Sequence, residues 1–188
     1  MTGTVTQVST ASNGSQLASV KTGVSLSADG SLVAFQSTDS DQHAGIMVKN
    51  LVTGGLSSVS TNGAGVEANG QSYNAQMAAN GQYVAFLSKA TNLVAADTNN
   101  ADDVFVKNLL TGAVVNASTS AAGAQANAPS ADVALSADGH WAAFTTYASN
   151  LVAGDDNYAD IYVKNLLTGA ITRASTNSAG GCRQRQQR

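Results

Sequence analysis

Residues 155–170 read DDNYADIYVKNLLTGA, and nearly the same stretch stands at 97–113, DTNNADDVFVKNLLTGA. A looser copy, DSDQHAGIMVKNLVTGG, occupies residues 39–55. Similarity at a fixed spacing is typical of one supersecondary unit copied in tandem. The sequence therefore predicts three copies of a single structural unit, and individual residues are best interpreted by their position in that unit.

Each copy reads as four short β-strands. The first strand ends at an Asp-Gly or Asn-Gly dipeptide, a strong hairpin signal that favours a type I′ turn with positive φ at both central residues. The third strand is apolar on both sides, which indicates that both of its faces are covered. The fourth, more polar strand follows a Thr-Gly pair and is typical of an outer edge. The Thr-Gly pairs begin at Thr2, Thr53, Thr111 and Thr168.

A four-stranded antiparallel unit that is covered on both faces and repeated in tandem predicts the blades of a β-propeller. A β-solenoid would have shorter coils, and a β-sandwich would not repeat its sequence. We therefore expect an all-β fold in a single repeat domain over residues 1–180. The expected blades cover about 11–61, 62–119 and 120–176.

The stretch LSADGHWAAFTTYASNLVAGDDNYADIYVKNLLTGAITRAST, residues 135–176, resembles the TolB-like propeller repeat, a relative of WD-type blades. The likeness lies in Ser-x-Asp-Gly before an Ala-Phe strand, then Asp-Ile-Tyr-Val and a last strand that follows a Gly turn. The resemblance extends over three full units, and it implies a rigid ring whose loops or channel contact partners. Some members are domains of larger secreted or periplasmic proteins. It places no catalytic residue on this sequence.

The fourth-strand pattern occurs once more than the other three strands, so residues 2–10 are expected to form an orphan outer strand. Closed propellers typically hold 4 to 8 blades, and three blades would leave two apolar end faces open to water. Two explanations fit: a piece of a longer propeller, or two copies that form a six-bladed homodimer.

Residues 181–188, GCRQRQQR, depart from the repeat. With one choice of codons, reading one base later restores the Asn-Gly-x-Ser pattern of residues 69–72, so these residues are interpreted as an out-of-frame ending on a truncated array. The alternative is a natural basic tail. Its Cys182 is the one cysteine of the chain and has no intrachain disulfide partner.

The composition limits the partners. Charged residues make up 11% of the 188 residues and the net charge is −3, which provides no basic face for nucleic acid. No apolar run is long enough for a membrane span, and the first residues lack a secretion signal. The abundance of Ala, Ser, Thr, Asn and Gly is common in exported bacterial repeat proteins, so we expect an extracellular or periplasmic location.

Loops rich in Asp and Asn precede the third strands of the second and third units. They are candidate calcium ligands because their oxygens recur at short spacings, although the loops lack the Gly and the bidentate Glu of an EF-hand. Asx-turns that satisfy backbone amides are the alternative. The candidate residues are Asp97, Asn99, Asp103, Asp155, Asn157 and Asp160.

Other chemistry has little support. His43 and His140 lack partners at zinc-ligand spacing, and there is no Gly-x-Ser-x-Gly nucleophile motif. Lys49, Lys107 and Lys164 recur with the blade and are interpreted as solvated side chains. We therefore expect no enzyme, but a non-catalytic scaffold for protein or glycan contact without an assigned cofactor. The alternative is a propeller that scaffolds a hydrolase or lyase with loop carboxylates.

Overall fold

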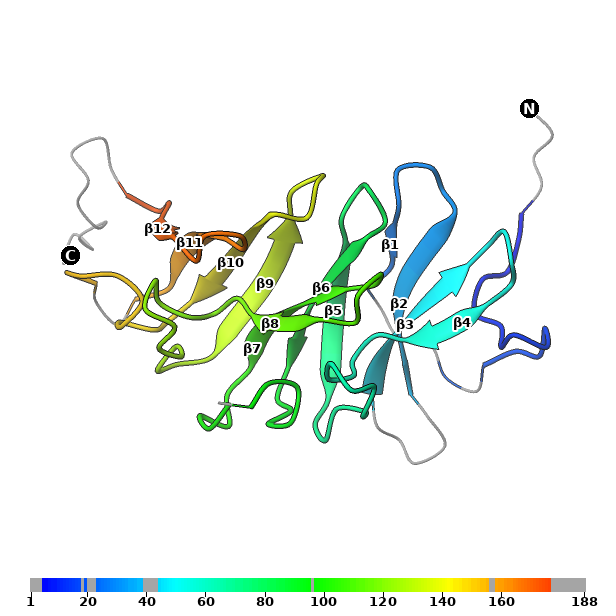
Figure 1. The fold of residues 1–188 in the computed structure, drawn as a ribbon, viewed down its shortest axis with the longest axis horizontal. Coiled ribbons are helices and arrows are strands. Elements are labelled where there is room, and N and C mark those ends of the chain that lie inside the picture. The colour runs from blue at the N-terminus through cyan, green and yellow to red at the C-terminus, as the bar shows by residue number, and fades with distance from the viewer. Residues whose placement is uncertain are drawn as a thin grey trace, which may run out of the picture.

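The computed structural model describes residues 5–17, 19, 23–38, 44–95, 97–155 and 158–176. Across these residues the chain forms twelve β-strands and no helix, arranged as three separate four-stranded sheets that stand side by side (Figure 1). The all-β expectation and the three repeated units are therefore confirmed. None of the described residues belongs to a helix of the length and apolar character that a membrane crossing requires.

Within every sheet the strands are antiparallel and lie in chain order. The first sheet consists of β1 (Ser25–Leu26), β2 (Leu32–Thr38), β3 (Ala44–Asn50) and β4 (Leu56–Ser58). The second consists of β5 (Ser72–Met77), β6 (Tyr83–Ser88), β7 (Asp103–Asn108) and β8 (Val114–Asn116). The third consists of β9 (Ser130–Leu135), β10 (Trp141–Thr146), β11 (Asp160–Asn165) and β12 (Ile171–Arg173).

Each sheet has two faces, named here by their neighbours. The leading face is turned toward the preceding sheet and carries, in the second sheet, Met77, Val84, Phe86 and Phe105. The trailing face is turned toward the next sheet and carries Tyr83, Ala85, Leu87, Val104 and Val106 in the second sheet. The pairing register shows which residues share a face, because directly paired residues, such as Phe86 and Phe105, point to the same face of the sheet.

The core lies between the sheets. One cluster joins the trailing face of the first sheet (Ala34, Ile46, Val48) to the leading face of the second. The other joins the trailing face of the second sheet to Val133, Ala142, Phe144 and Tyr162 on the leading face of the third. The two interfaces repeat one scheme, in which small and β-branched side chains pack against aromatic rings.

The hairpin prediction is confirmed, but the turn type is not. The Gly30 N–H donates to Ser27 O, so Ala28 and Asp29 are the central residues and Gly30 follows at φ +71°. Asp29 is not among the residues with positive φ, so the predicted type I′ turn is wrong. Leu26 pairs with Val33 and the Ser27 N–H donates to Leu32 O, so residues 28–31 form a four-residue loop with glycine in the left-handed region. The Asp29 carboxylate also accepts from the Ser31 N–H, which fixes the loop.

The expected orphan strand at 2–10 is not formed over its described residues. A strand needs a neighbour to pair with, and no strand among the described residues pairs with residues 5–7. Residues 8–17 nevertheless follow the repeat. The bridge between Thr10 and Gln16 matches the bridges Thr61 to Glu67 and Thr119 to Gln125. The tail at 181–188 lies outside the described residues.

Candidate functional site

A groove of about 420 Å³ lies among the three sheets, where residues of β2, β5, β6 and β9 and the segment just before β1 line it. It is lined by Gly23, Gln36, Tyr73, Asn74, Leu87, Ala131 and Asp132. These residues come from a few repeat positions. Gly23, Asn74 and Asp132 are equivalent, Tyr73 and Ala131 precede two of them, and Gln36 and Leu87 share a place in the second strand. Because the repeat supplies the same positions in every unit, neighbouring sheets together build the groove.

The backbone is left-handed where the repeat enters the groove. The φ angles are +97° at Gly23, +55° at Asn74 and +46° at Asp132. In β5 and β9 this position coincides with a break in pairing register next to Tyr73 and Val133. Such β-bulges re-aim side chains, and Gly, Asn and Asp are the residue types that tolerate this backbone best. The bulges therefore present polar side chains at the groove.

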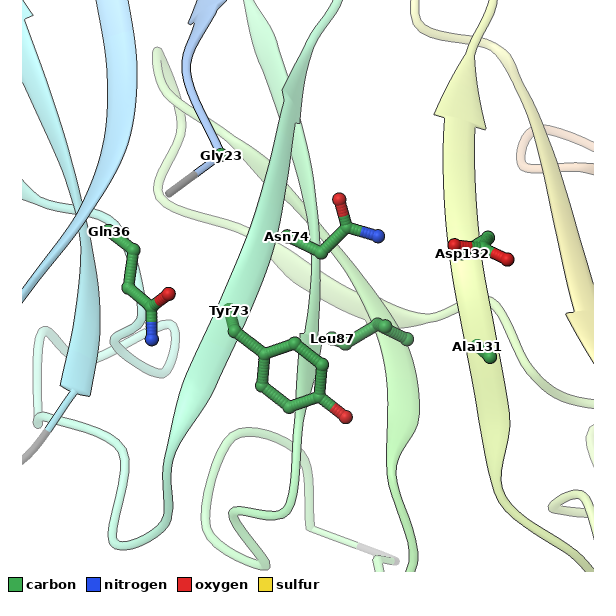
Figure 2. A pocket seen from close by; sticks show the side chains of 7 residues that line it. All are labelled: Gly23, Gln36, Tyr73, Asn74, Leu87, Ala131 and Asp132. Carbon is green, nitrogen blue, oxygen red and sulfur yellow. The ribbon is translucent and has the colours of Figure 1, made fainter. Parts of the chain in front are cut away.

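Within the described residues, the side chains of Gln36, Asn74 and Asp132 have no hydrogen-bond or ion-pair partner in the chain. Figure 2 shows Asn74 and Tyr73 extending from β5 toward β9, with Gln36 on the neighbouring sheet. Burial raises the pKa of Tyr73, and a hydrogen bond to Asp102 raises it further. The groove thus offers two amides, a carboxylate and a neutral phenol beside the apolar wall of Leu87.

The described calcium-ligand candidates lie elsewhere, in the loops before β7 and β11 and at the first residue of each of these strands, and protein donors surround them. Asp97 accepts from Gln125 Nε2 at 3.1 Å. Asn99 gives its amide N–H to Asp103 at 2.9 Å, and its oxygen accepts from the Ala101 N–H. The Asn99 contacts correspond to the Asx-turn alternative.

The third unit uses its carboxylates in a similar way. Asp155 accepts from Arg173 Nη1 at 2.9 Å and from the Tyr162 hydroxyl, and Asp160 accepts from Ser175. Asn157 lies outside the described residues. The described part of the chain contains no group of three or more His, Cys, Asp or Glu side chains that is arranged to hold a metal ion. Calcium at these loops stays a prediction.

Asp103 joins the third strand to the segment after the fourth. Its carboxylate accepts from the Ser118 hydroxyl, while the Val104 N–H donates to Ser118 Oγ at 3.0 Å. Burial raises the pKa of Asp103, although the hydrogen bonds from Ser118 and Asn99 oppose this. In the first unit Gly45 stands at this position, and Ser60 Oγ accepts from the Ile46 N–H at 3.0 Å. Ser60, Ser118 and Ser175 accept from the same backbone N–H in the three units, and Asp103 adds a second hydrogen bond to this serine in the second unit.

The three repeated lysines are buried, so their interpretation as solvated side chains is wrong. Lys107 Nζ donates to Thr61 O at 2.9 Å, Thr61 Oγ1 at 2.8 Å and Asn62 O at 3.0 Å. Lys164 makes the same contacts with Thr119 and Ser120. Burial lowers the pKa of both lysines. Each ammonium therefore fastens a sheet to the segment that leaves the preceding sheet.

Lys49 makes this contact with the N-terminal segment, donating to Thr10 O at 2.9 Å and Ala11 O at 3.1 Å. Residues 10–11 therefore lie against the first sheet as residues 61–62 lie against the second. The signal for these contacts was present in the sequence. A lysine at one fixed position in every unit, in a chain with few charges, indicates a specific partner.

Sequence reasoning also missed the groove. The available signal was the presence of Gly23, Asn74 and Asp132 at one position of an otherwise strand-forming segment. All three residue types are depleted in strands and tolerate positive φ.

Separate four-stranded antiparallel sheets that are packed face to face in tandem, with residues from all three units lining a shared groove, define blades of a β-propeller. Among solved structures, the chain is similar to TolB from Acinetobacter baumannii, with 18% identity and a TM-score of 0.54. The match covers 87% of this chain and 34% of that one. A putative TolB from Agrobacterium tumefaciens matches with 14% identity and a TM-score of 0.57, over 85% of this chain and 50% of that one.

The β-propeller domain of the Trilobed protease from Pyrococcus furiosus, described as having an open velcro topology, matches with 12% identity and a TM-score of 0.54. That match covers 84% of this chain and 42% of the other. The chain thus spans half or less of the length of these structures. At such identities the likeness shows the fold, and the TolB-like resemblance is confirmed at that level. No family model and no curated protein matches the sequence.

Proposed function

We propose that the chain is a non-catalytic propeller scaffold that acts outside the cytoplasm and holds a protein segment or a glycan in the inner groove. The observation that carries the proposal is a set of polar side chains without partners among the described residues, namely Asn74 and Asp132 at one repeat position of the first strand and Gln36 in a second strand. Polar groups without intramolecular partners are available to a ligand. The volume lies within the range of roughly 300–1,000 Å³ typical of ligand sites.

The chemistry of the groove supports contact with a polar, uncharged or cationic ligand. Amides and a carboxylate can pair with hydroxyls or with peptide N–H and C=O groups, while Tyr73 and Leu87 supply apolar surface. The loop carboxylates of the hydrolase or lyase alternative are instead hydrogen-bonded to Gln, Ser, Asn and Arg side chains. The geometry of the described residues thus favours binding.

The test uses a glycan array and an array of extended peptides, probed with the labelled chain. The decisive variants are Asn74→Gly and Asp132→Gly, because Gly23 already occupies the equivalent position at positive φ. They remove the polar groups without backbone strain. We expect binding to one array, and its loss in the double variant.

The matched control is Gln82→Leu, which removes an exposed amide on the hairpin between β5 and β6. It should bind as the unchanged chain does. Binding that survives the double glycine variant would overturn the groove as the contact site. A chain that binds to neither array would overturn the scaffold itself.

A further inference from the structure

The two internal interfaces define how one sheet of this chain covers another. In both, a side chain at the start of the second strand covers the hairpin glycine of the next sheet. An added Cβ on Gly139 would meet Tyr83 Cδ2 at 2.2 Å, and one on Gly81 would meet Leu32 Cδ1 at 3.2 Å. Gly30, the same residue of the first sheet, has nothing within 4 Å of that point. The leading face of the first sheet therefore has an unfilled place for a large side chain.

The trailing face of the third sheet carries such a side chain. Trp141 holds the repeat position of Leu32 and Tyr83, and it is 45% exposed. Ile161 is 47% exposed, whereas its equivalents Ile46 and Val104 are fully buried. These two residues mark the uncovered trailing face.

The leading face of the first sheet is also uncovered, and its apolar residues are exposed. Val24 is 66% and Leu26 is 55% exposed, while their equivalents Ala75 and Met77 in the second sheet are buried in the core. Internally, Met77 shares its cluster with Ile46, the equivalent of Ile161. The two open faces of one molecule are therefore the two halves of an interface that the chain already forms twice.

From this match we infer that two copies of the chain associate head to tail, with Trp141 and Ile161 of each copy packed on Gly30, Val24 and Leu26 of the other. Three sheets per copy give a closed ring of six, within the 4 to 8 that propellers typically hold, whereas three copies would give nine. Closure forms two equivalent interfaces and leaves no sheet face open. Ring closure also places the groove of each copy around the common central axis of the ring.

One segment must move to allow this contact. Residues 8–10 occupy the place that the segment after a preceding fourth strand would take, and the corresponding segment of the partner is residues 174–176. That segment follows β12, which is hydrogen-bonded to β11, whereas residues 5–9 have no strand pairing. The partner's Thr176 carbonyl would replace Thr10 O on Lys49, as Thr61 O serves Lys107. The exchange preserves the lysine contact while the apolar faces become buried.

The test exploits the fact that Trp141 is the one tryptophan of the chain. Sedimentation equilibrium over a dilution series should show a monomer and a species of twice its mass. Tryptophan emission should shift to shorter wavelength along the same binding curve, because association removes Trp141 from water. A chain that stays monomeric at all concentrations would overturn the inference, and assemblies that keep growing with concentration would overturn ring closure.

A charge exchange identifies the faces. Leu26→Lys and Ile161→Glu each place a charge in both interfaces of a homodimer, and each should weaken association by at least about 100-fold. An equimolar mixture of the two variants should recover dimers. In such a dimer one interface is unchanged and the other pairs Lys with Glu.

The matched controls are Val52→Lys and Leu167→Glu, which put the same charges on exposed turn residues of the same units. Both should associate as the unchanged chain does, and far-ultraviolet circular dichroism checks the folding of every variant. Loss of dimers in the single variants without recovery in the mixture would overturn the pairing of these two faces.

Discussion

The interfaces between sheets and the two outward faces are built from the same repeat, yet they differ in what covers them. Ile46 and Val104 are fully buried, while Ile161, the third copy of that position, is 47% exposed. The residue type is nearly constant, so burial is decided by whether another sheet follows. Stability in this chain is therefore a property of neighbouring pairs of sheets, as expected for a tandem-repeat architecture.

The largest expected effect compares a buried and an open position. Phe86→Ala removes a ring stacked on Phe105 inside the first interface, at a centroid separation of 6.0 Å. It should lower the free energy of unfolding by about 3–5 kcal/mol. Ile161→Ala should cost less than about 1 kcal/mol when the chain is diluted to its monomeric state, because the side chain is already half exposed.

Urea unfolding monitored by circular dichroism measures both changes, with Leu110→Ala on an exposed turn as the control. Similar costs for Phe86→Ala and Ile161→Ala in the monomer would contradict the view that neighbouring sheets supply the stability.

The buried lysines provide the next comparison. Lys107→Met leaves Thr61 O and Asn62 O without their donor between two sheets, and it should lower the free energy of unfolding by about 2–4 kcal/mol. Lys49→Met should cost less, because its acceptors Thr10 O and Ala11 O follow residues 5–9, which form no strand, whereas Thr61 and Asn62 follow β4 of a complete sheet.

Thermal melting of the two variants checks this order, beside Lys89→Met as a control. Lys89 lies 3.8 Å from Asp102 and its side chain is mostly exposed, so its removal should change stability by less than about 1 kcal/mol. An effect of Lys107→Met no larger than that of Lys89→Met would show that the buried ammonium contributes nothing.

A third comparison uses two copies of the hairpin glycine. Both have φ near +70°, so an alanine at either site costs about 1 kcal/mol for the left-handed backbone. Gly139→Ala should cost about 1–3 kcal/mol more than Gly30→Ala, because the new methyl group overlaps the Tyr83 ring of the second sheet. The difference in urea midpoint between the two variants measures the cost of the contact with Tyr83, because the left-handed backbone is common to both sites. Equal midpoints would mean that Tyr83 moves away without cost.

Much of the fold could be predicted from the sequence, because repetition and apolar patterning are local signals. The hairpin at Asp29-Gly30 and the third strand of the second sheet, which is covered on both faces, are predicted correctly in this way. The third strand of the third sheet is predicted to be covered on both faces, but Ile161 on one of them is 47% exposed. The turn type is not predicted correctly, since the hydrogen bond from Gly30 to Ser27 places the turn one residue earlier than the dipeptide alone indicates. Turn geometry depends on the register of the flanking strands, which the dipeptide does not specify.

The site was less predictable because its contacts cross between units. Lys107 finds its acceptors 45 and 46 residues earlier in the chain, and spacing within one unit cannot reveal them. The composition of the Asp-rich loops indicates calcium ligands, but in the structure the Asp103 carboxylate accepts hydrogen bonds from Ser118 and Asn99. The groove depends on left-handed backbone at Asn74 and Asp132, a feature that becomes visible only when the units are aligned with one another.

The smallest expected effect concerns Asp103, which the second unit buries and for which the first unit has Gly45. Because burial raises its pKa in the folded state, the folded protein binds a proton more readily than the unfolded chain. The cost of the buried charge is then present at neutral pH and is relieved as the pH falls through the folded pKa toward the ordinary value of 3.8. The free energy of unfolding of the unchanged chain should therefore rise relative to that of Asp103→Asn as the pH is lowered.

Urea midpoints at pH 7 and about pH 4.5 measure this difference in free energy between the unchanged chain and Asp103→Asn. The change between the two pH values must exceed the change measured for the control Asp132→Asn, whose side chain lies in the groove. A difference that stays constant, or that moves the other way, would mean that the hydrogen bonds from Ser118 and Asn99 outweigh burial at this carboxyl group.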